Sequence, residues 1–177
     1  IVRIQQNSRH YYQRPDLSST KLDTARTSLS GDAAMIGISK IAGEHVRFNS
    51  NVSMKSPGFD INDVGFLRRA DTRNEGNWIQ FRSDKPNKWV RSRNINFNQY
   101  AGWNSDGDRL YSGANVNSHW TFTNNWSIGA GYNVNWLNFD DRATRGGPGV
   151  YMDGNRGVWY YVNSDNRRVV SLNYFGS

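Results

Sequence analysis

Residues 110–122 and 126–136 alternate apolar and polar side chains with a period of two, and no other feature of the chain constrains its fold as strongly. This period places successive side chains on opposite faces of a β-strand. Trp126 and Trp136 share a face and lie ten positions apart. For a strand tilted by about 45°, that spacing is about 23 Å of membrane height, close to the roughly 25 Å band between aromatic girdles. The pattern predicts two adjacent strands of a transmembrane β-barrel.

The alternation assigns the side chains of these two strands to two environments. The row expected to face lipid is Leu110, Val116, Trp120, Phe122, Trp126, Ile128, Val134 and Trp136. The row expected to face a polar lumen is Asn115, Asn117, His119, Thr121, Asn133 and Asn135. The strands of a soluble β-sandwich alternate as well, so that alternative stays open, but it gives no reason for two tryptophans at this spacing.

Composition is compatible with a barrel. Mean hydropathy is −0.80, and no apolar run approaches the ~20 residues of a membrane-spanning helix, but only alternate residues of a barrel strand meet lipid. Cysteine is absent, which excludes disulfides and thiolate metal sites. The net charge of +7 is carried mainly by arginines scattered over expected turns and strand ends. This distribution disfavours nucleic acid as a partner and suits lipopolysaccharide phosphates or anionic headgroups.

Turn signals divide the chain, a single domain spanning residues 1–177, into about nine strands. They are predicted at 2–12, 31–41, 44–54, 74–83, 88–103, 110–122, 126–136, 150–163 and 167–175. The short links 42–43, 85–87, 123–125 and 164–166 fall at one end of the strands, the short-turn end. The long links 13–30, 55–73 and 141–149, with the compact 104–109, fall at the other, the long-loop end. Short periplasmic turns and long outer loops are typical of the bacterial outer membrane.

Loop lengths also predict the register of two hairpins. A two-residue Asp106-Gly107 turn pairs Trp103 with Leu110, so that the apolar faces match. A three-residue loop at 123–125, with one Asn in the left-handed conformation, pairs Phe122 with Trp126. Bacterial barrels usually have an even number of strands. We therefore expect the sheet to continue beyond Ser177 or through a partner, as a fragment of a larger barrel.

Three segments carry a resemblance to a known family. They are Arg26-Thr-Ser-Leu-Ser-Gly-Asp32, Ser39-Lys-Ile-Ala-Gly-Glu-His45 and Ser56-Pro-Gly-Phe-Asp-Ile-Asn-Asp-Val-Gly-Phe-Leu-Arg-Arg-Ala-Asp71. The chain resembles the barrel portion of a bacterial outer-membrane family of unknown function. In that family the barrel usually follows a periplasmic module similar to family-nine carbohydrate-binding domains. This sequence does not include that module and is shorter than the family's barrel, so the resemblance implies a fold and a location but no reaction.

The loop at 56–71 is the first place where chemistry could reside. Its candidate binding residues are Asp60, Asp63, Arg68, Arg69 and Asp71. The carboxylates could hold Ca²⁺, and the arginines could bind lipid A phosphates. The favoured interpretation is structural: Asp–Arg pairs fold the loop, and Phe59 and Phe66 pack against the barrel.

Other polar clusters give weaker signals. Ser118 and His119 are adjacent on a strand, so they point to opposite faces and cannot pair as nucleophile and base. Trp159, Tyr160 and Tyr161 could stack on sugars, although an aromatic girdle is the simpler interpretation. No spacing of His, Asp or Glu indicates a metal site, and no cofactor or catalytic residue is identified.

The sequence as a whole predicts an antiparallel transmembrane β-barrel with a structural, channel or accessory-subunit role. The expected partners are outer-membrane lipid or lipopolysaccharide and other envelope subunits. Two alternatives stay open. One is an outer-membrane hydrolase acting on lipid or glycan, and the other is a soluble carbohydrate-binding β-sandwich.

Overall fold

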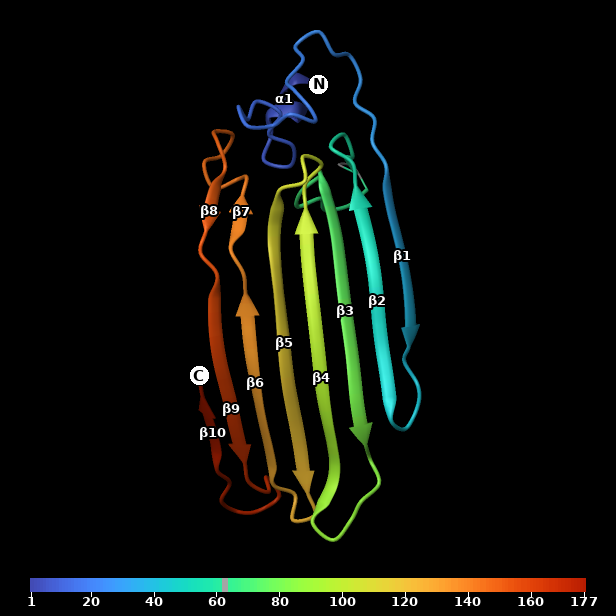
Figure 1. Cartoon of the computed structure of the whole chain (residues 1–177), viewed down its shortest axis with the longest axis vertical. Helices are drawn as coiled ribbons and strands as arrows, with labels where there is room; N and C mark the ends of the chain where they lie inside the picture. Colours follow the sequence, from blue (N-terminus) through green and yellow to red (C-terminus); the bar gives the residue numbers. More distant parts are fainter. Residues whose placement is uncertain (62–63) are drawn as a thin grey trace.

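A computed structural model describes residues 1–61 and 64–177, and these form one antiparallel sheet with a small ribbon beside it (Figure 1). The eight-stranded sheet has the order β1-β2-β3-β4-β5-β6-β9-β10, and β7 pairs with β8. The bounds are α1 (Val2–Gln6), β1 (Ala33–Lys40), β2 (Val46–Lys55), β3 (Thr72–Ser83), β4 (Val90–Trp103), β5 (Arg109–Phe122), β6 (Ser127–Asn135), β7 (Asn138–Asp140), β8 (Val150–Met152), β9 (Asn155–Asn163) and β10 (Asn173–Gly176).

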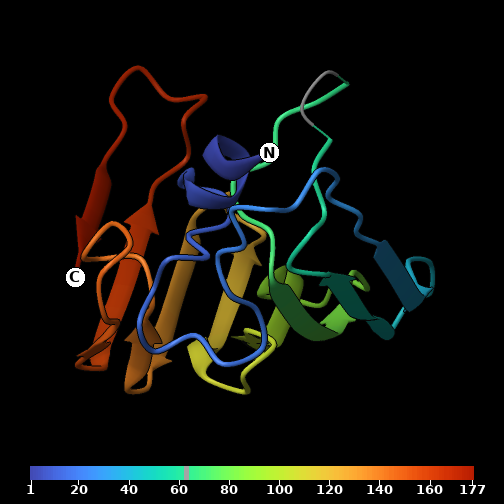
Figure 2. The same ribbon diagram turned by 90° about the horizontal axis from the view of Figure 1, so that it is seen from above.

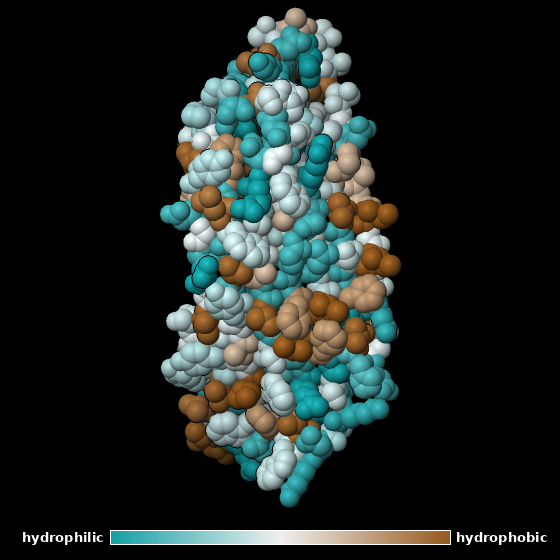
Figure 3. All heavy atoms as spheres, in the orientation of Figure 1, coloured by the Kyte–Doolittle hydropathy of each residue, from teal (hydrophilic) through white to brown (hydrophobic). Residues whose placement is uncertain are grey.

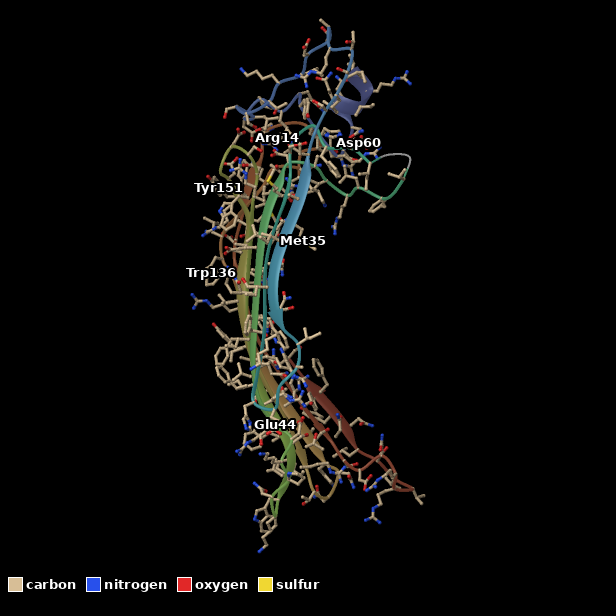
Figure 4. All side chains as sticks on the ribbon, turned by 90° about the vertical axis from the view of Figure 1, so that its right-hand side faces the viewer. Arg14, Met35, Glu44, Asp60, Trp136 and Tyr151 are labelled. Atoms are coloured by element: carbon tan, nitrogen blue, oxygen red, sulfur yellow. The ribbon has the colours of Figure 1, made fainter. Side chains whose placement is uncertain are left out.

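The sheet is a single curved layer. Seen from above, the strands follow an arc, and the N-terminal segment lies within the arc at the long-loop end (Figure 2). The side view shows the same curvature along the strands, with Trp136 on the convex side (Figure 4). Among the described residues, β1 and β10 do not pair with each other, so the sheet is open and is not closed into a barrel.

The predicted hairpin registers are confirmed inside the sheet. Thr121 pairs with Ser127, and the Phe122 N–H donates to the Trp126 carbonyl at 2.9 Å. Asn125 is the predicted left-handed residue, with a φ of 64°. At the other hairpin, Gly102 pairs with Tyr111, which is the expected register.

The last pair of that second hairpin differs from the prediction. Trp103 faces Arg109 instead of Leu110, because a register shift follows Gly102. The turn is longer than two residues: the Asn104 N–H bonds to the Asp108 carbonyl at 3.1 Å, around a Gly107 with a φ of 89°. A bulge at a hairpin end absorbs the extra residue without changing which faces meet.

The strand predicted at 2–12 is wrong. The backbone N–H groups of Ile4 and Gln5 both donate to the Ile1 carbonyl, at 2.9 and 3.0 Å, which makes α1. The fully buried Gln5 side chain then exchanges hydrogen bonds with the backbone of Asp23, at 2.9 and 3.0 Å. A polar residue that appeared to belong to an alternating strand instead anchors a folded segment.

The strands predicted at 150–163 and 167–175 are only partly correct. The first is divided into β8 and β9 at Gly154, where an added Cβ would lie 2.3 Å from the Asn135 carbonyl oxygen. The second shrinks to β10, and Val169 and Val170 are fully exposed outside it. The carboxylate of Asp165 accepts the Arg167 N–H at 3.1 Å and folds that stretch into a turn.

Buried apolar side chains gather at the long-loop end rather than along the sheet. They are Tyr12, Leu17, Leu67, Ala70, Ala101 and Leu110. No second layer covers either face of the strands within the described part of the chain. Among the described residues, none of the helices has the length and apolar character needed to span a bilayer.

Candidate functional site

The convex face of the sheet carries the apolar rows of all the strands, and nothing in the described chain covers it. The register aligns Val52 on β2 with Ile36 on β1, and Tyr132 on β6 with Val158 on β9. Their exposed fractions are 52, 76, 40 and 58%, respectively. Apolar residues gather in patches on this face, around a more polar area nearer the long-loop end (Figure 3).

Among the residues expected to face lipid, those that the register places on this convex surface are Val116, Trp120, Phe122, Ile128 and Val134, and Trp136 lies on the same side (Figure 4). Trp126, Ile128 and Trp136 are 38, 37 and 43% exposed. Val116, Trp120, Phe122 and Val134 are half-buried among their neighbours. Leu110 differs, because it is only 9% exposed and belongs to the small core at the long-loop end.

The more polar area is a hydrogen-bonded cluster on β2, β3 and β4. The Ser50 hydroxyl donates to Asn77 at 2.6 Å, Asn77 donates to Gln99 at 2.5 Å, and Gln99 donates to Glu75 at 2.7 Å. These side chains satisfy one another, which lowers the cost of placing them on an otherwise apolar face.

The concave face carries rows of asparagines that bond to one another across the strands. Asn98 on β4 donates to Asn115 on β5 at 2.9 Å, and Asn115 donates in turn to Asn133 on β6. Near the long-loop end, Asn135 on β6 accepts from the Tyr100 hydroxyl at 2.6 Å and donates to Asn155 on β9 at 2.7 Å. The predicted polar row therefore forms a network that crosses four strands.

Aromatic rings on the same face lie over glycines of the neighbouring strand. A Cβ added to Gly131 would meet the Trp159 ring at 2.5 Å, and one added to Gly129 would meet the Tyr161 ring at 2.3 Å. A glycine leaves space for a ring from the adjacent strand to lie against the backbone. The glycines of β6 thus explain why these large side chains fit on the concave side.

His119 occupies the centre of this aromatic group. Its ring lies 5.7 Å from Trp159 and 5.8 Å from Tyr161, measured between ring centroids. Nε2 lies 3.1 Å from the Asn117 amide oxygen, so Nε2 carries the proton, and Nδ1 accepts from the Tyr161 hydroxyl at 3.0 Å. Ser118 lies on the opposite face, where its hydroxyl donates to the Asn94 carbonyl at 2.8 Å. The two neighbours do not form a catalytic pair.

A buried charge cluster joins three distant loops at the long-loop end. Asp141, whose side chain is 1% exposed, accepts from Arg14 at 2.5 Å. It also accepts from Arg69 at 2.9 and 2.7 Å. Arg142 donates to the carbonyls of Ser8 and Arg9. Burial, together with the nearby charge of Arg69, lowers the pKa of Arg142 to about 10.

Two further carboxylates attach the N-terminal segment to the loops. Asp106 accepts the N–H groups of Ser18 and Ser19 at 2.9 and 2.6 Å, and Asp16 accepts the N–H of Gly149 at 2.8 Å. Burial acts to raise the pKa of both carboxyls, but these hydrogen bonds outweigh it and lower both pKa values.

The loop candidates at 56–71 are not brought together into one site. Asp60 lies 3.3 Å from His10, whereas Asp71 accepts the N–H of Ser105 at 2.8 Å. Arg68 is exposed, and Asp63 lies outside the described residues. Arg69 does pair with an aspartate, but with Asp141 from another loop. Phe66 is 89% exposed, so its expected packing against the sheet is wrong.

Sequence reasoning missed Arg14, Asp141 and Arg142, which form most of the buried charge cluster. Arg14 and the adjacent pair Asp141-Arg142 lie in irregular segments, and no local spacing connects position 14 with position 141. A general excess of arginine in loops was the only available signal, and it indicated surface phosphates instead of a buried pair.

Comparison with known proteins shows the family of the chain. The model of a family described as a domain of unknown function (DUF5916) matches residues 1–176, and the chain belongs to this family. Searches of curated proteins and of solved structures returned no match.

Proposed function

We propose that this chain forms wall strands of a bacterial outer-membrane β-barrel. Because its family has no assigned function, the proposal rests on the geometry of the sheet. Its convex face contacts lipid, and its concave face lines a water-filled lumen. The role is that of a channel wall or scaffold, without an identified reaction.

The observation that carries the proposal is the uncovered apolar face of a one-layer sheet. Ile36, Val52 and Val158 are each more than half exposed. An apolar row starts at Val158 and crosses the sheet to β2 through Tyr132, Val116, Phe97, Ile79 and Phe48. A soluble sheet buries such a face against a second layer. In a bilayer the hydrocarbon does this, and the polar face turns toward the lumen.

The curvature supports the same arrangement. The sheet follows an arc (Figure 2). Its convex face carries the apolar patches (Figure 3) and its concave face the asparagine rows, which is the arrangement of the two faces in a segment of barrel wall. The short-turn end corresponds to the periplasm and the long-loop end to the exterior. Exposed Arg68 and Arg145 near the long-loop end are suited to lipopolysaccharide phosphates.

Adjacent residues of β9 give a matched test of membrane contact. Val158 lies on the convex face, and Gly157 lies on the concave face with no atom near the position of an added Cβ. We expect Val158→Arg to reduce flotation of the chain with lipid vesicles, because arginine costs about 2–4 kcal/mol at the midplane of a barrel's lipid face. Gly157→Arg should float like the unmodified chain. Equal flotation of both variants would overturn the proposal, as would absence of the unmodified chain from the vesicle fraction.

A further inference from the structure

The concave face is polar and uncharged along the middle of β4, β5, β6 and β9. Between the register shifts, along Ser92–Gly102 of β4, Tyr111–Thr121 of β5, β6 and β9, every residue whose side chain faces this side is an amide, a hydroxyl, an aromatic, His119 or glycine, by register and sequence. Charges on the same face lie at the ends of the neighbouring strands, Arg47 and Lys55 on β2 and Arg82 on β3, and Arg109 ends β5 beyond its register shift. A lumen that selects ions is lined by rings of charge, so this surface suits a neutral solute.

The amides keep hydrogen-bonding sites available after pairing with one another. An asparagine side chain has two donor hydrogens and two acceptor lone pairs. Asn98 uses one donor, on Asn115, and Asn133 uses one acceptor site, for the same residue. Both side chains are fixed in orientation by these bonds, so their remaining donors and acceptors are held in place for a ligand with many hydroxyl groups.

A flat aromatic surface lies beside these amides. The rings of Trp159 and Tyr161 are parallel to within 5°, with centroids 6.3 Å apart. One side of the Trp159 ring lies against Gly131 and one side of the Tyr161 ring lies against Gly129. The other side of each ring therefore faces the space within the concave side of the sheet. His119 bonds to the Tyr161 hydroxyl and fixes that ring. The apolar face of a pyranose ring fits such a surface, because its C–H groups meet the negative face of the π-system.

From these observations we infer that the concave face binds neutral oligosaccharides, with Trp159 and Tyr161 as the stacking surface and Asn98 and Asn133 as hydroxyl partners. The inference names the solute class for the lumen and rests on the proposed function for access from the lumen. Binding itself requires only the concave face. Anionic saccharides find no arginine or lysine among the concave side chains of Ser92–Gly102, Tyr111–Thr121, β6 and β9, which carry the site.

Calorimetric titration of the whole chain in detergent, with maltohexaose as the neutral probe and a galacturonate hexamer as the anionic one, tests this inference. We expect maltohexaose to bind and the galacturonate hexamer to bind much more weakly. Trp159→Ala should weaken maltohexaose binding by about tenfold, the effect of one lost aromatic contact. The control is Tyr160→Ala, whose side chain is on the convex face of the same strand, and it should bind like the unmodified chain.

Each result of these titrations either supports saccharide binding at the concave face or overturns it. If Trp159→Ala does not fold, Trp159→Phe keeps a ring over Gly131 and should bind maltohexaose a few-fold more weakly. No binding of maltohexaose by the unmodified chain, equal binding by the tryptophan variants, or equal binding of the anionic hexamer would each overturn it. Failure of the membrane proposal is seen separately in vesicle flotation, which does not depend on the saccharide.

Discussion

Neutralising Asp141 should release the N-terminal segment from the long-loop end. The carboxylate accepts three hydrogen bonds from Arg14 and Arg69, and both of its oxygens are used. In Asp141→Asn, the Arg14 side chain, which is 2% exposed, keeps Asp16, at 3.2 Å, as its only charged partner among the described residues. Arg69 and Arg142 then repel Arg14 without a central anion.

The size of the effect follows from this burial. Removal of one partner from a buried ion pair costs about 3–5 kcal/mol, because the remaining charge stays in a poorly solvated place. Since about 1.4 kcal/mol is a factor of ten in an equilibrium constant, the open form of residues 1–30 should become at least about a hundredfold more populated. Combining Asp141→Asn with Arg14→Gln should restore part of the loss, because the double variant has one fewer unpaired guanidinium.

Limited trypsin digestion measures this opening, because Arg3, Arg9, Lys21 and Arg26 supply cleavage sites within the segment. When opening and closing are faster than cleavage, the rate follows the population of the open form. The control is Glu44→Gln at the short-turn end, where Glu44 and its partner Lys85 are 72 and 73% exposed and contribute little. If Asp141→Asn were cleaved no faster than Glu44→Gln, the proposed role of the cluster would be refuted.

Two further predictions concern the concave face and the acid response. Gly131→Ala should destabilise the sheet by about 1–3 kcal/mol, because its Cβ would lie 2.5 Å from the Trp159 ring; urea unfolding measures this against Gly157→Ala, whose Cβ meets nothing within 4 Å. The pKa of Asp106 is lowered in the folded chain, so its contribution is complete above pH about 4 and is lost as the pH falls through the folded-state value. The protection factors of the Ser18 and Ser19 amides, which compare the exchange rate with the intrinsic rate at the same pH, should therefore fall in acid. This fall should be smaller in Asp106→Asn; an identical acid response in that variant would count against the assignment.

The sheet was predictable from the sequence because its information is local. Alternation of apolar and polar residues defines a strand, and the parity of neighbouring strands limits the loop between them. This reasoning predicted a loop at 123–125 with one left-handed Asn and the register of the hairpin; the structure has Thr121 paired with Ser127 in that register, and the left-handed residue is Asn125. Ends of strands were less predictable, since Gly107 and Gly154 allow a bulge and a break that alternation does not encode.

The long-loop end was not predictable for the opposite reason. Its structure depends on contacts such as Arg14 with Asp141, which are 127 positions apart. The segment 2–12 alternates like a strand, but the buried hydrogen bonds of Gln5 with Asp23 decide its conformation. Only part of the concave site was predictable from the sequence. The polar row was expected, whereas the aromatic surface over Gly129 and Gly131 depends on the pairing of β6 with β9, which are separated in the sequence by β7 and β8.

The two faces of the sheet should respond oppositely to their surroundings. Asparagine pairs and ring–glycine contacts on the concave face are made within the protein, so substitutions such as Gly131→Ala should cost the same in detergent and in lipid. The convex face makes few contacts of its own, and its free energy depends on what covers it. Replacement of Val158 by arginine removes exposed apolar surface in water but places a charge in hydrocarbon in a bilayer. The same substitution should therefore increase solubility without lipid and reduce membrane insertion with it, and this change of sign separates a lipid-facing surface from one that simply tolerates exposure.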